Sequence, residues 1–369
     1  MTQQKTHVNL RIPGPTPVPD DILQAVAHPM VNHRGKEFAG VIERVAAKLK
    51  DFFITRQDVM ILSCSGSGGL EAAVVNTLSP GDKVLAVTIG AFGERLATIA
   101  EVYGADVTVL PYEWGQAAHG DDIRHALKEN PEIKAVLITH NETSTGVTNP
   151  LAQIAEVVRE FDKLLVVDAV SSLGAIPCEV DAWGLDCVVT GSQKGWMVPP
   201  GLAFACLSDR GWKAYEQARM PRFYFDLGKH RDAQSKGQTP FTPAMPIFFG
   251  LDVALERMAL EGMESIFTRH KKAAAATREG VKSLGLQLLC QDERFASDTV
   301  TAVKCPEGID VSNLRKLMED EYNTVLAGGQ GKLSGKIFRI GHLGLVDESD
   351  IRETIASLGD ALRKLGYKS

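Results

Sequence analysis

The sequence predicts an α/β fold: a mostly parallel, doubly wound sheet of seven strands, accompanied by a smaller C-terminal α+β domain. Two observations support this prediction. Short apolar runs rich in β-branched residues recur between residues 59 and 208, and helical patterns lie between most of them. Such near-continuous apolar strands are typical of parallel sheets with helices on both faces. Beyond residue 261 the order changes to helix, strands and helix, which indicates a second domain.

Each element has its own signal in the sequence. The expected strands, in chain order, are VMILS, KVLAVT, DVTVL, KAVLIT, LLVVDAV, DCVVTG and LAFACLS. Helical patterns lie between these strands, in GLEAAVVNTL, FGERLATIAEVYG and LAQIAEVVREF. A long helix is predicted after the last strand, in MPIFFGLDVALERMALEG. The second domain has two helical patterns, IFTRHKKAAAATREGVKSLG and DESDIRETIASLGDALRKLG. It also has two strand-like runs, TVTAVKC and KIFRIGHLG. We therefore expect an N-terminal arm over residues 1–20, a large domain over 21–260 and a small domain over 261–369.

Composition excludes several classes of function. The chain has 369 residues, 44% of them hydrophobic, and a net charge of −6 at pH 7, so no nucleic-acid partner is expected. No signal peptide and no apolar run of roughly 18 residues is present, which predicts a cytoplasmic protein without membrane contact. The six cysteines form no C-x-x-C pair, as in reduced intracellular proteins. No H-E-x-x-H or paired Cys/His spacing occurs, so no metal is expected.

The ligand site is expected outside the carboxyl ends of the strands, as in other open α/β sheets. The first strand is followed by SCSGSGGLEAA, in which Ser65, Gly66 and Ser67 open a helix. Free N–H groups at a helix N-terminus, together with serine hydroxyls, bind phosphate well. The stretch has neither the GK[ST] of a Walker loop nor the G-x-G-x-x-G pattern. A tight strand-to-helix connection that needs glycine explains the same residues.

Three later strands also end in residues that a ligand can use. Phe92 follows the second strand and is suited to stack on a planar ligand, or is ordinary core. Thr143 lies in the polar stretch HNETSTG, part of which a helix N-cap explains. Asp168 ends the apolar strand LLVVD, where a carboxylate is costly unless it meets a cation or hydrogen-bond donors. A turn or cap formed by Asp168 is the alternative.

Lys194 lies in the apolar and stiff stretch GSQKGWMVPPGL, just after another strand. Burial lowers the pKa of an amine and makes it a usable nucleophile, although a lysine that extends to solvent fits this position too. Taken together, these residues match the needs of pyridoxal 5′-phosphate. That cofactor requires a phosphate cup, a ring stacker, a carboxylate at the pyridine nitrogen and a lysine for its aldehyde. The sequence therefore predicts a pyridoxal-phosphate enzyme.

The whole chain resembles the class V aminotransferases, which belong to the fold-type I pyridoxal-phosphate enzymes. It is most similar to the alanine–glyoxylate and serine–pyruvate (or serine–glyoxylate) branch. The resemblance depends on the combination of IPGPTPVP, SGSGGLEAA, THNETSTGV, VVDAVSSLG, GSQKGWMVPPG, QTPFTP and FRIGHLG. It implies that Lys194 bonds to the cofactor, that Asp168 is the partner of its ring nitrogen, and that Arg339 binds the substrate carboxylate.

The resemblance also implies a set of cofactor-binding residues. Besides Lys194 and Asp168, these are Ser65, Gly66, Ser67 and Gln193 at the phosphate, Phe92 and Val170 on the ring, Thr143 near the ring oxygen, and Thr242 of the neighbouring subunit. Ser67 replaces a histidine of some relatives, and Phe92 a common tryptophan. Thr239 stands where some relatives have tyrosine, so that contact is less well supported. Gly14 matches part of the pocket wall. A contact that crosses between subunits implies an obligate homodimer.

His33 and Arg34 in MVNHRGKEF have two interpretations: they line the mouth of the pocket, or they form a capping and salt-bridging pair. Arg339 has two as well. Strand alternation puts Ile337 and Arg339 on one face and Phe338 on the other, so the arginine needs an anion. That anion is either the substrate carboxylate or an acidic residue of the small domain.

These observations predict a transaminase that moves an amino group from alanine or serine to glyoxylate or pyruvate. Another small donor, such as aspartate, ureidoglycine or an aminophosphonate, is the nearest alternative. A cysteine desulfurase is disfavoured, because Gln193 stands where those enzymes usually have histidine and no cysteine lies in an evident flexible loop near Arg339. A pyridoxal-phosphate-binding protein without turnover, associated with a redox complex, is a further alternative that intact Lys194, Asp168 and Arg339 disfavour.

Overall fold

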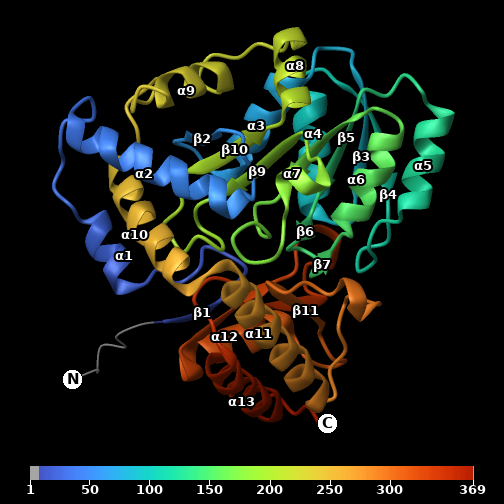
Figure 1. The fold of residues 1–369 in the computed structure, drawn as a ribbon. Helices are drawn as coiled ribbons and strands as arrows, with labels where there is room; N and C mark the ends of the chain where they lie inside the picture. Colours follow the sequence, from blue (N-terminus) through green and yellow to red (C-terminus); the bar gives the residue numbers. More distant parts are fainter. Residues whose placement is uncertain (1–7, 369) are drawn as a thin grey trace.

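The computed structural model describes residues 8–368, and its centre is a seven-stranded sheet in the order β2-β10-β9-β8-β5-β3-β4 (Figure 1). Its strands are β2 (Val59–Leu62), β3 (Lys83–Thr88), β4 (Asp106–Pro111), β5 (Ala135–Thr139), β8 (Leu164–Asp168), β9 (Cys187–Gly191) and β10 (Ala203–Leu207). The pairs within β9-β8-β5-β3-β4 are parallel, whereas β10 is antiparallel to both β9 and β2. The predicted fold class and all of the strands expected in this sheet are confirmed.

Helices cover both faces of this sheet (Figure 1). The helices of this part of the chain are α1 (Asp20–Val26), α2 (Lys36–Phe53), α3 (Gly66–Thr77), α4 (Ala91–Val102), α5 (Gly120–Glu129), α6 (Leu151–Glu160), α7 (Val180–Trp183), α8 (Asp209–Gln217), α9 (Leu227–Gln234) and α10 (Met245–Glu261), of which α1 packs on α10. Successive residues of a strand point to opposite faces of the sheet and pack in different apolar clusters: Val166 belongs to one cluster and Val167 to the other. Burial on both faces explains why these strands read as continuous apolar runs rather than as alternating ones.

The second sheet has the order β1-β12-β13-β11 and packs against α11 (Met263–Ser283), α12 (Val311–Tyr322) and α13 (Glu348–Lys364). Its strands are β1 (Asn9–Arg11), β11 (Val300–Lys304), β12 (Thr324–Gly328) and β13 (Ile337–Gly341). The sequence predicted β11 and β13 but not β12 or β1. β1 pairs with β12 in parallel, so residues 9–11 of the predicted arm form an edge of the small sheet. Residues 1–7 and 369 lie outside the described residues.

Short elements complete the fold. They are β6 (Asn141–Glu142), β7 (Val147–Thr148) and the 3₁₀ turns Glu293–Phe295 and Gly331–Leu333. Within residues 8–368, no helix combines the length and the apolar character that crossing a membrane requires. The division of the chain into 21–260 and 261–369 stays a prediction; α10 and α11 meet at Gly262, which has a φ of +80°.

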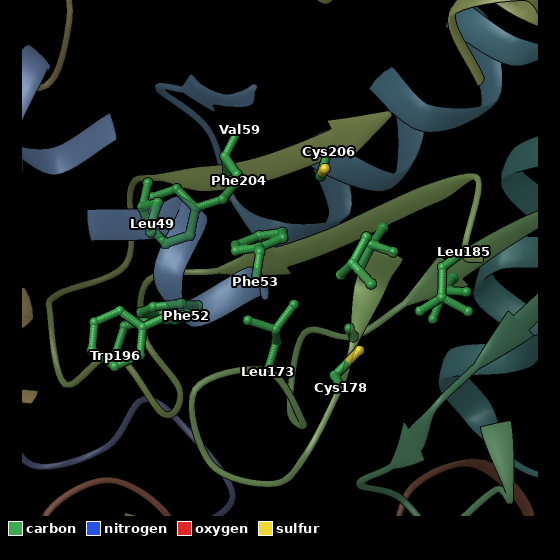
Figure 2. Packing of buried hydrophobic residues seen from close by; sticks show 14 of the residues in the cluster. Leu49, Phe52, Phe53, Val59, Leu173, Cys178, Leu185, Trp196, Phe204 and Cys206 are labelled. Carbon is green, nitrogen blue, oxygen red and sulfur yellow. The ribbon is translucent and has the colours of Figure 1, made fainter. Parts of the chain in front are cut away.

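The turn after β9 is fixed in the core by an aromatic cluster (Figure 2). Trp196 is fully buried, stacks on Phe53 at 6.2 Å between ring centroids and meets Phe204 edge-on at 5.4 Å. Its indole N–H donates to the Thr190 hydroxyl at 3.2 Å. Lys194 lies two residues before Trp196, so the packing of Trp196 fixes the backbone from which the Lys194 side chain extends.

Candidate active site

Lys194 lies in the interior, with 8% of its surface exposed. Its Nζ donates a hydrogen bond to the carbonyl oxygen of Pro13, and Gly14 packs directly on its side chain. A Cβ on Gly14 would lie 2.6 Å from Cδ of Lys194, so this close approach requires glycine. Burial, aided by the charge of Arg339, lowers the pKa of Lys194 to about 8. The unprotonated form of the amine is therefore far more populated near neutral pH than in an ordinary lysine, whose pKa is about 10.4.

Asp168 is the last residue of β8 and has 3% of its surface exposed. Its Oδ1 accepts a hydrogen bond from the N–H of Val170 at 2.9 Å. Burial raises the pKa of Asp168 to about 7, and Glu142 raises it further, while Lys194 and Arg95 oppose the shift. A carboxylate with one hydrogen bond and this pKa is suited to bind a cationic group of a ligand.

The N-terminus of α3 lies beside Asp168. Ser65 caps the helix, and its Oγ accepts from the N–H of Gly68 at 3.5 Å. A Cβ on Gly66 would lie 3.0 Å from Cγ2 of Val170, so the first turn of α3 touches the loop after β8. Ser67 follows in the same turn, which contains no acidic residue. The free N–H groups of this turn form an anion-binding end of the helix.

Gln193 lies between Lys194 and this helix end. Its Oε1 is buried, and within residues 8–368 it has no hydrogen-bond partner. A Cβ on Gly191 would lie 3.3 Å both from that oxygen and from Cα of Gly66, which locates the carboxamide beside the first turn of α3. An unsatisfied buried carboxamide is costly, so this side chain remains available to a ligand.

The position of Phe92 depends on a buried carboxylate that the sequence did not single out. Glu142 has 0% of its surface exposed, and it accepts hydrogen bonds from the N–H groups of Phe92 at 3.1 Å and Gly93 at 3.0 Å. Ser144 supports it, with its N–H 3.1 Å from Glu142 Oε1. The predicted N-cap in HNETSTG does not form for a following helix, because α6 begins after Pro150 without a side-chain cap; Glu142 instead accepts from N–H groups in the first turn of α4, which lies earlier in the chain. The only available signal was an acidic residue in a polar stretch directly after an apolar strand.

Arg339 lies in β13 with 5% of its surface exposed. Its Nε donates to the carbonyl oxygen of Gly328 at 2.9 Å, and its Nη1 donates to that of Thr143 at 2.8 Å. Among the ion pairs of residues 8–368, none involves Arg339, so the alternative of a salt bridge within the small domain has no support. Burial lowers the pKa of Arg339 to about 10, and its remaining N–H groups are available for an anion.

The structure locates Thr239 and Thr242 in the segment between α9 and α10. The hydroxyl of Thr239 donates to the carbonyl oxygen of Phe241 at 2.7 Å, whereas Thr242 is exposed. Arg34 donates to the carbonyl oxygen of Thr239 at 2.5 Å, and within the described chain it pairs with no carboxylate. Arg34 therefore ties the loop before α2 to this segment, while His33 is half-buried.

The residues present fit pyridoxal phosphate. The amine of Lys194 has a lowered pKa, Asp168 is a buried carboxylate, and the end of α3 offers N–H groups to a phosphate. The unpartnered oxygen of Gln193 and the close packing at Gly14 are features of a site shaped for a ligand. Cys64, just before α3, is half-buried, and burial raises the pKa of its thiol to about 12.

Comparison with known proteins identifies close relatives along the whole chain. The family described as aminotransferase class V matches residues 15–338. A soluble hydrogenase 42 kDa subunit of Anabaena cylindrica is 47% identical over 98% of this chain and 94% of its own length. A serine–glyoxylate aminotransferase of Methylorubrum extorquens is 37% identical, covering 100% and 94%. The solved alanine–glyoxylate aminotransferase of a Nostoc species superposes with a TM-score of 0.93 at 30% identity, covering 98% and 97%.

Proposed function

This chain belongs to the class V aminotransferase family, and we propose that it transfers an amino group from alanine or serine to glyoxylate or pyruvate, with pyridoxal 5′-phosphate as cofactor. The observation that carries the proposal is the meeting of Lys194, Asp168 and Arg339 at one site. Each is at least nine-tenths buried, each has a shifted pKa, and Arg339 contributes to the shift of Lys194. Relatives named for serine and alanine transamination to glyoxylate support these substrates.

The cofactor-binding roles follow from this chemistry. Lys194 would hold the aldehyde, Asp168 the ring nitrogen, and the first turn of α3 with Gln193 the phosphate. Phe92 and Val170 would lie against the ring, and Thr143 near its oxygen. When bound, pyridoxal phosphate supplies an electron sink that stabilises negative charge on the substrate Cα.

The protein's own groups perform the remaining steps. Arg339 binds the carboxylate of the amino acid through paired N–H groups, which fixes the direction of the Cα–H bond. Nζ of Lys194, with its pKa lowered to about 8, takes the proton from Cα as a general base. The carboxylate of Asp168 would pair with the protonated ring nitrogen. Burial raises the pKa of Asp168, and a cation next to it favours the ionised carboxylate again. Gly14 and Pro13 keep the amine within reach.

A homodimer is part of the proposal. Thr242 is exposed in a single subunit, and Phe223, whose ring meets that of Phe241 at 5.5 Å between centroids, has 71% of its surface exposed. A large aromatic side chain with this exposure is typical of an interface residue. In the dimer, Thr242 would reach the phosphate of the partner's site. The expected cytoplasmic location stays a prediction.

Aspartate, ureidoglycine and aminophosphonates are the alternative donors, because they share the α-amino-acid core or its phosphonate counterpart. The desulfurase alternative requires a reactive thiolate. The cysteines are buried or half-buried, and burial raises the thiol pKa of Cys64 and Cys206 to about 12. A relative named as a soluble hydrogenase subunit keeps open the alternative of a protein associated with a redox complex. Lys194, Asp168 and Arg339 are all intact, which supports catalysis instead.

The test is a screen of purified protein against several donors and acceptors. Alanine or serine with glyoxylate should give ping-pong kinetics, and borohydride should fix the cofactor on Lys194. Lys194→Ala should bind pyridoxal phosphate without covalent fixation and have almost no turnover. No binding of pyridoxal phosphate, or fixation on another lysine, would overturn the cofactor assignment. Release of sulfide from cysteine without any transamination would favour a desulfurase.

A further inference from the structure

Arg95 connects two parts of the proposed cofactor site. It lies on α4, three residues after Phe92, and its Cζ is 4.7 Å from the centroid of the Phe92 ring. Its Nη1 also approaches the hydroxyl of Ser67 to 3.4 Å, in the first turn of α3. The guanidinium therefore lies between the residue expected to stack on the cofactor ring and the turn expected to bind its phosphate.

The charge of Arg95 is not neutralised by a partner within residues 8–368, where none of the ion pairs involves it. Glu71 follows Ser67 by one turn on α3, but it accepts from the hydroxyl of Tyr103 at 2.8 Å instead. Exposed arginines elsewhere on the surface, such as Arg294, do pair with acidic residues. The field of Arg95 nevertheless reaches the catalytic groups, because it lowers the pKa of both Lys194 and Asp168.

None of the other predicted ligands of the cofactor phosphate carries a positive charge. The phosphate-binding turn and Gln193 offer only neutral groups, and a phosphate monoester carries a charge of about −1.5 to −2 near neutral pH. Lys194 is committed to the aldehyde and Arg339 to the substrate carboxylate. We propose that Arg95 is the cationic ligand of the cofactor phosphate. Arg95 would bind the phosphate from α4, and the N–H groups of the first turn of α3 would bind it from their own helix. This inference rests on the proposed function.

Arginine suits this role because its planar fork matches phosphate geometry and acts together with helix N–H groups. The competing explanation is that Arg95 only packs on Phe92 through a cation–π contact, which stabilises the ring stacker. The two explanations differ in one respect. A phosphate ligand discriminates between pyridoxal phosphate and pyridoxal, which lacks the phosphate, whereas a support for Phe92 affects both to the same extent.

The experiment measures dissociation constants of pyridoxal phosphate and of pyridoxal for the cofactor-free protein, by absorbance and fluorescence titration. Arg95→Gln should weaken pyridoxal phosphate about 10-fold or more, because a charge-assisted contact is lost, and change pyridoxal less than about 2-fold. Arg95→Lys keeps the charge and should lie between the parent and Arg95→Gln. The matched control is Arg56→Gln, an arginine whose side chain is 96% exposed before β2, and it should change neither constant.

Two outcomes would overturn the inference. Equal weakening of both ligands would assign Arg95 to the support of Phe92, and unchanged constants would remove it from the site. If Arg95→Gln fails to fold by circular dichroism, the Arg95→Lys comparison decides between the explanations in the same way. Failure of the parent protein to bind pyridoxal phosphate at all would instead refute the proposed function, so the two failures are distinguishable.

Discussion

Replacement of Arg339 by lysine tests the substrate side of the site most directly. The guanidinium is held in place by the carbonyl oxygens of Gly328 and Thr143, at 2.9 and 2.8 Å. These two tethers leave its other N–H groups in a fixed plane, ready for the two oxygens of a carboxylate. A lysine ammonium keeps the charge but cannot make the tethers and the paired contact at once.

The size of the effect follows from the number of hydrogen bonds lost. One charge-assisted hydrogen bond contributes about 1.5–3 kcal/mol. Loss of one such bond in the transition state therefore lowers kcat/KM by roughly 10- to 150-fold. The loss should be similar for every α-carboxylate donor and acceptor, since all of them present the same group to Arg339. Binding of pyridoxal phosphate should change little, because none of its predicted ligands is altered.

The assay is kcat/KM for alanine, serine and glyoxylate, together with the dissociation constant for pyridoxal phosphate and the melting temperature. Arg315→Lys is the matched control: Arg315 also donates to a carbonyl oxygen of β12, that of Leu326, at 2.8 Å. It should leave kcat/KM unchanged. Unaltered kinetics in Arg339→Lys would remove Arg339 from the substrate site, and loss of the folded protein would assign it a structural role.

Three further predictions concern other parts of the site and a buried histidine of the small domain. In the cofactor-free protein, Lys194 should react with an amine-selective reagent with a midpoint near pH 8, because burial lowers its pKa, and a midpoint near that of exposed lysines would contradict this. Gly14→Ala should slow covalent capture of the cofactor at Lys194, since the new Cβ meets the lysine chain; Gly81→Ala, which also has a positive φ (+83°, against +121° at Gly14) but nothing near its Cβ, is the control for backbone strain. His342 is fully buried, and its pKa is lowered to about 3, so the unfolded chain binds one more proton below about pH 6.5. The stability advantage over His342→Gln in urea denaturation should therefore shrink by about 1.4 kcal/mol per pH unit as the pH falls from 6 to 4.5, and parallel curves would contradict it.

Much of the large sheet was predictable because its physical causes are local. Burial on both faces makes β3, β5 and β8 continuous apolar runs, and the carboxyl ends of parallel strands necessarily meet at one edge. That geometry brings Asp168 to the α3 turn without further information. β1 was not predictable: its three residues carry almost no pattern, and their partner, β12, lies more than 300 positions later.

The electrostatic character of the site could not be predicted residue by residue, because it arises between segments that are distant in the chain. A lysine in an apolar stretch can extend to water. For Lys194, the loop at Pro13 and Gly14 prevents this, and Pro13, which accepts the hydrogen bond of the amine, lies 181 positions earlier in the chain. Likewise, Glu142 caps α4 only because β5 and β3 are neighbours in the sheet. Once buried there, it favours the charged forms of Lys194 and Arg339 and opposes that of Asp168. Replacing Glu142 would therefore alter the stacking residue and the charge balance together, which is why a single role cannot be assigned to it from sequence.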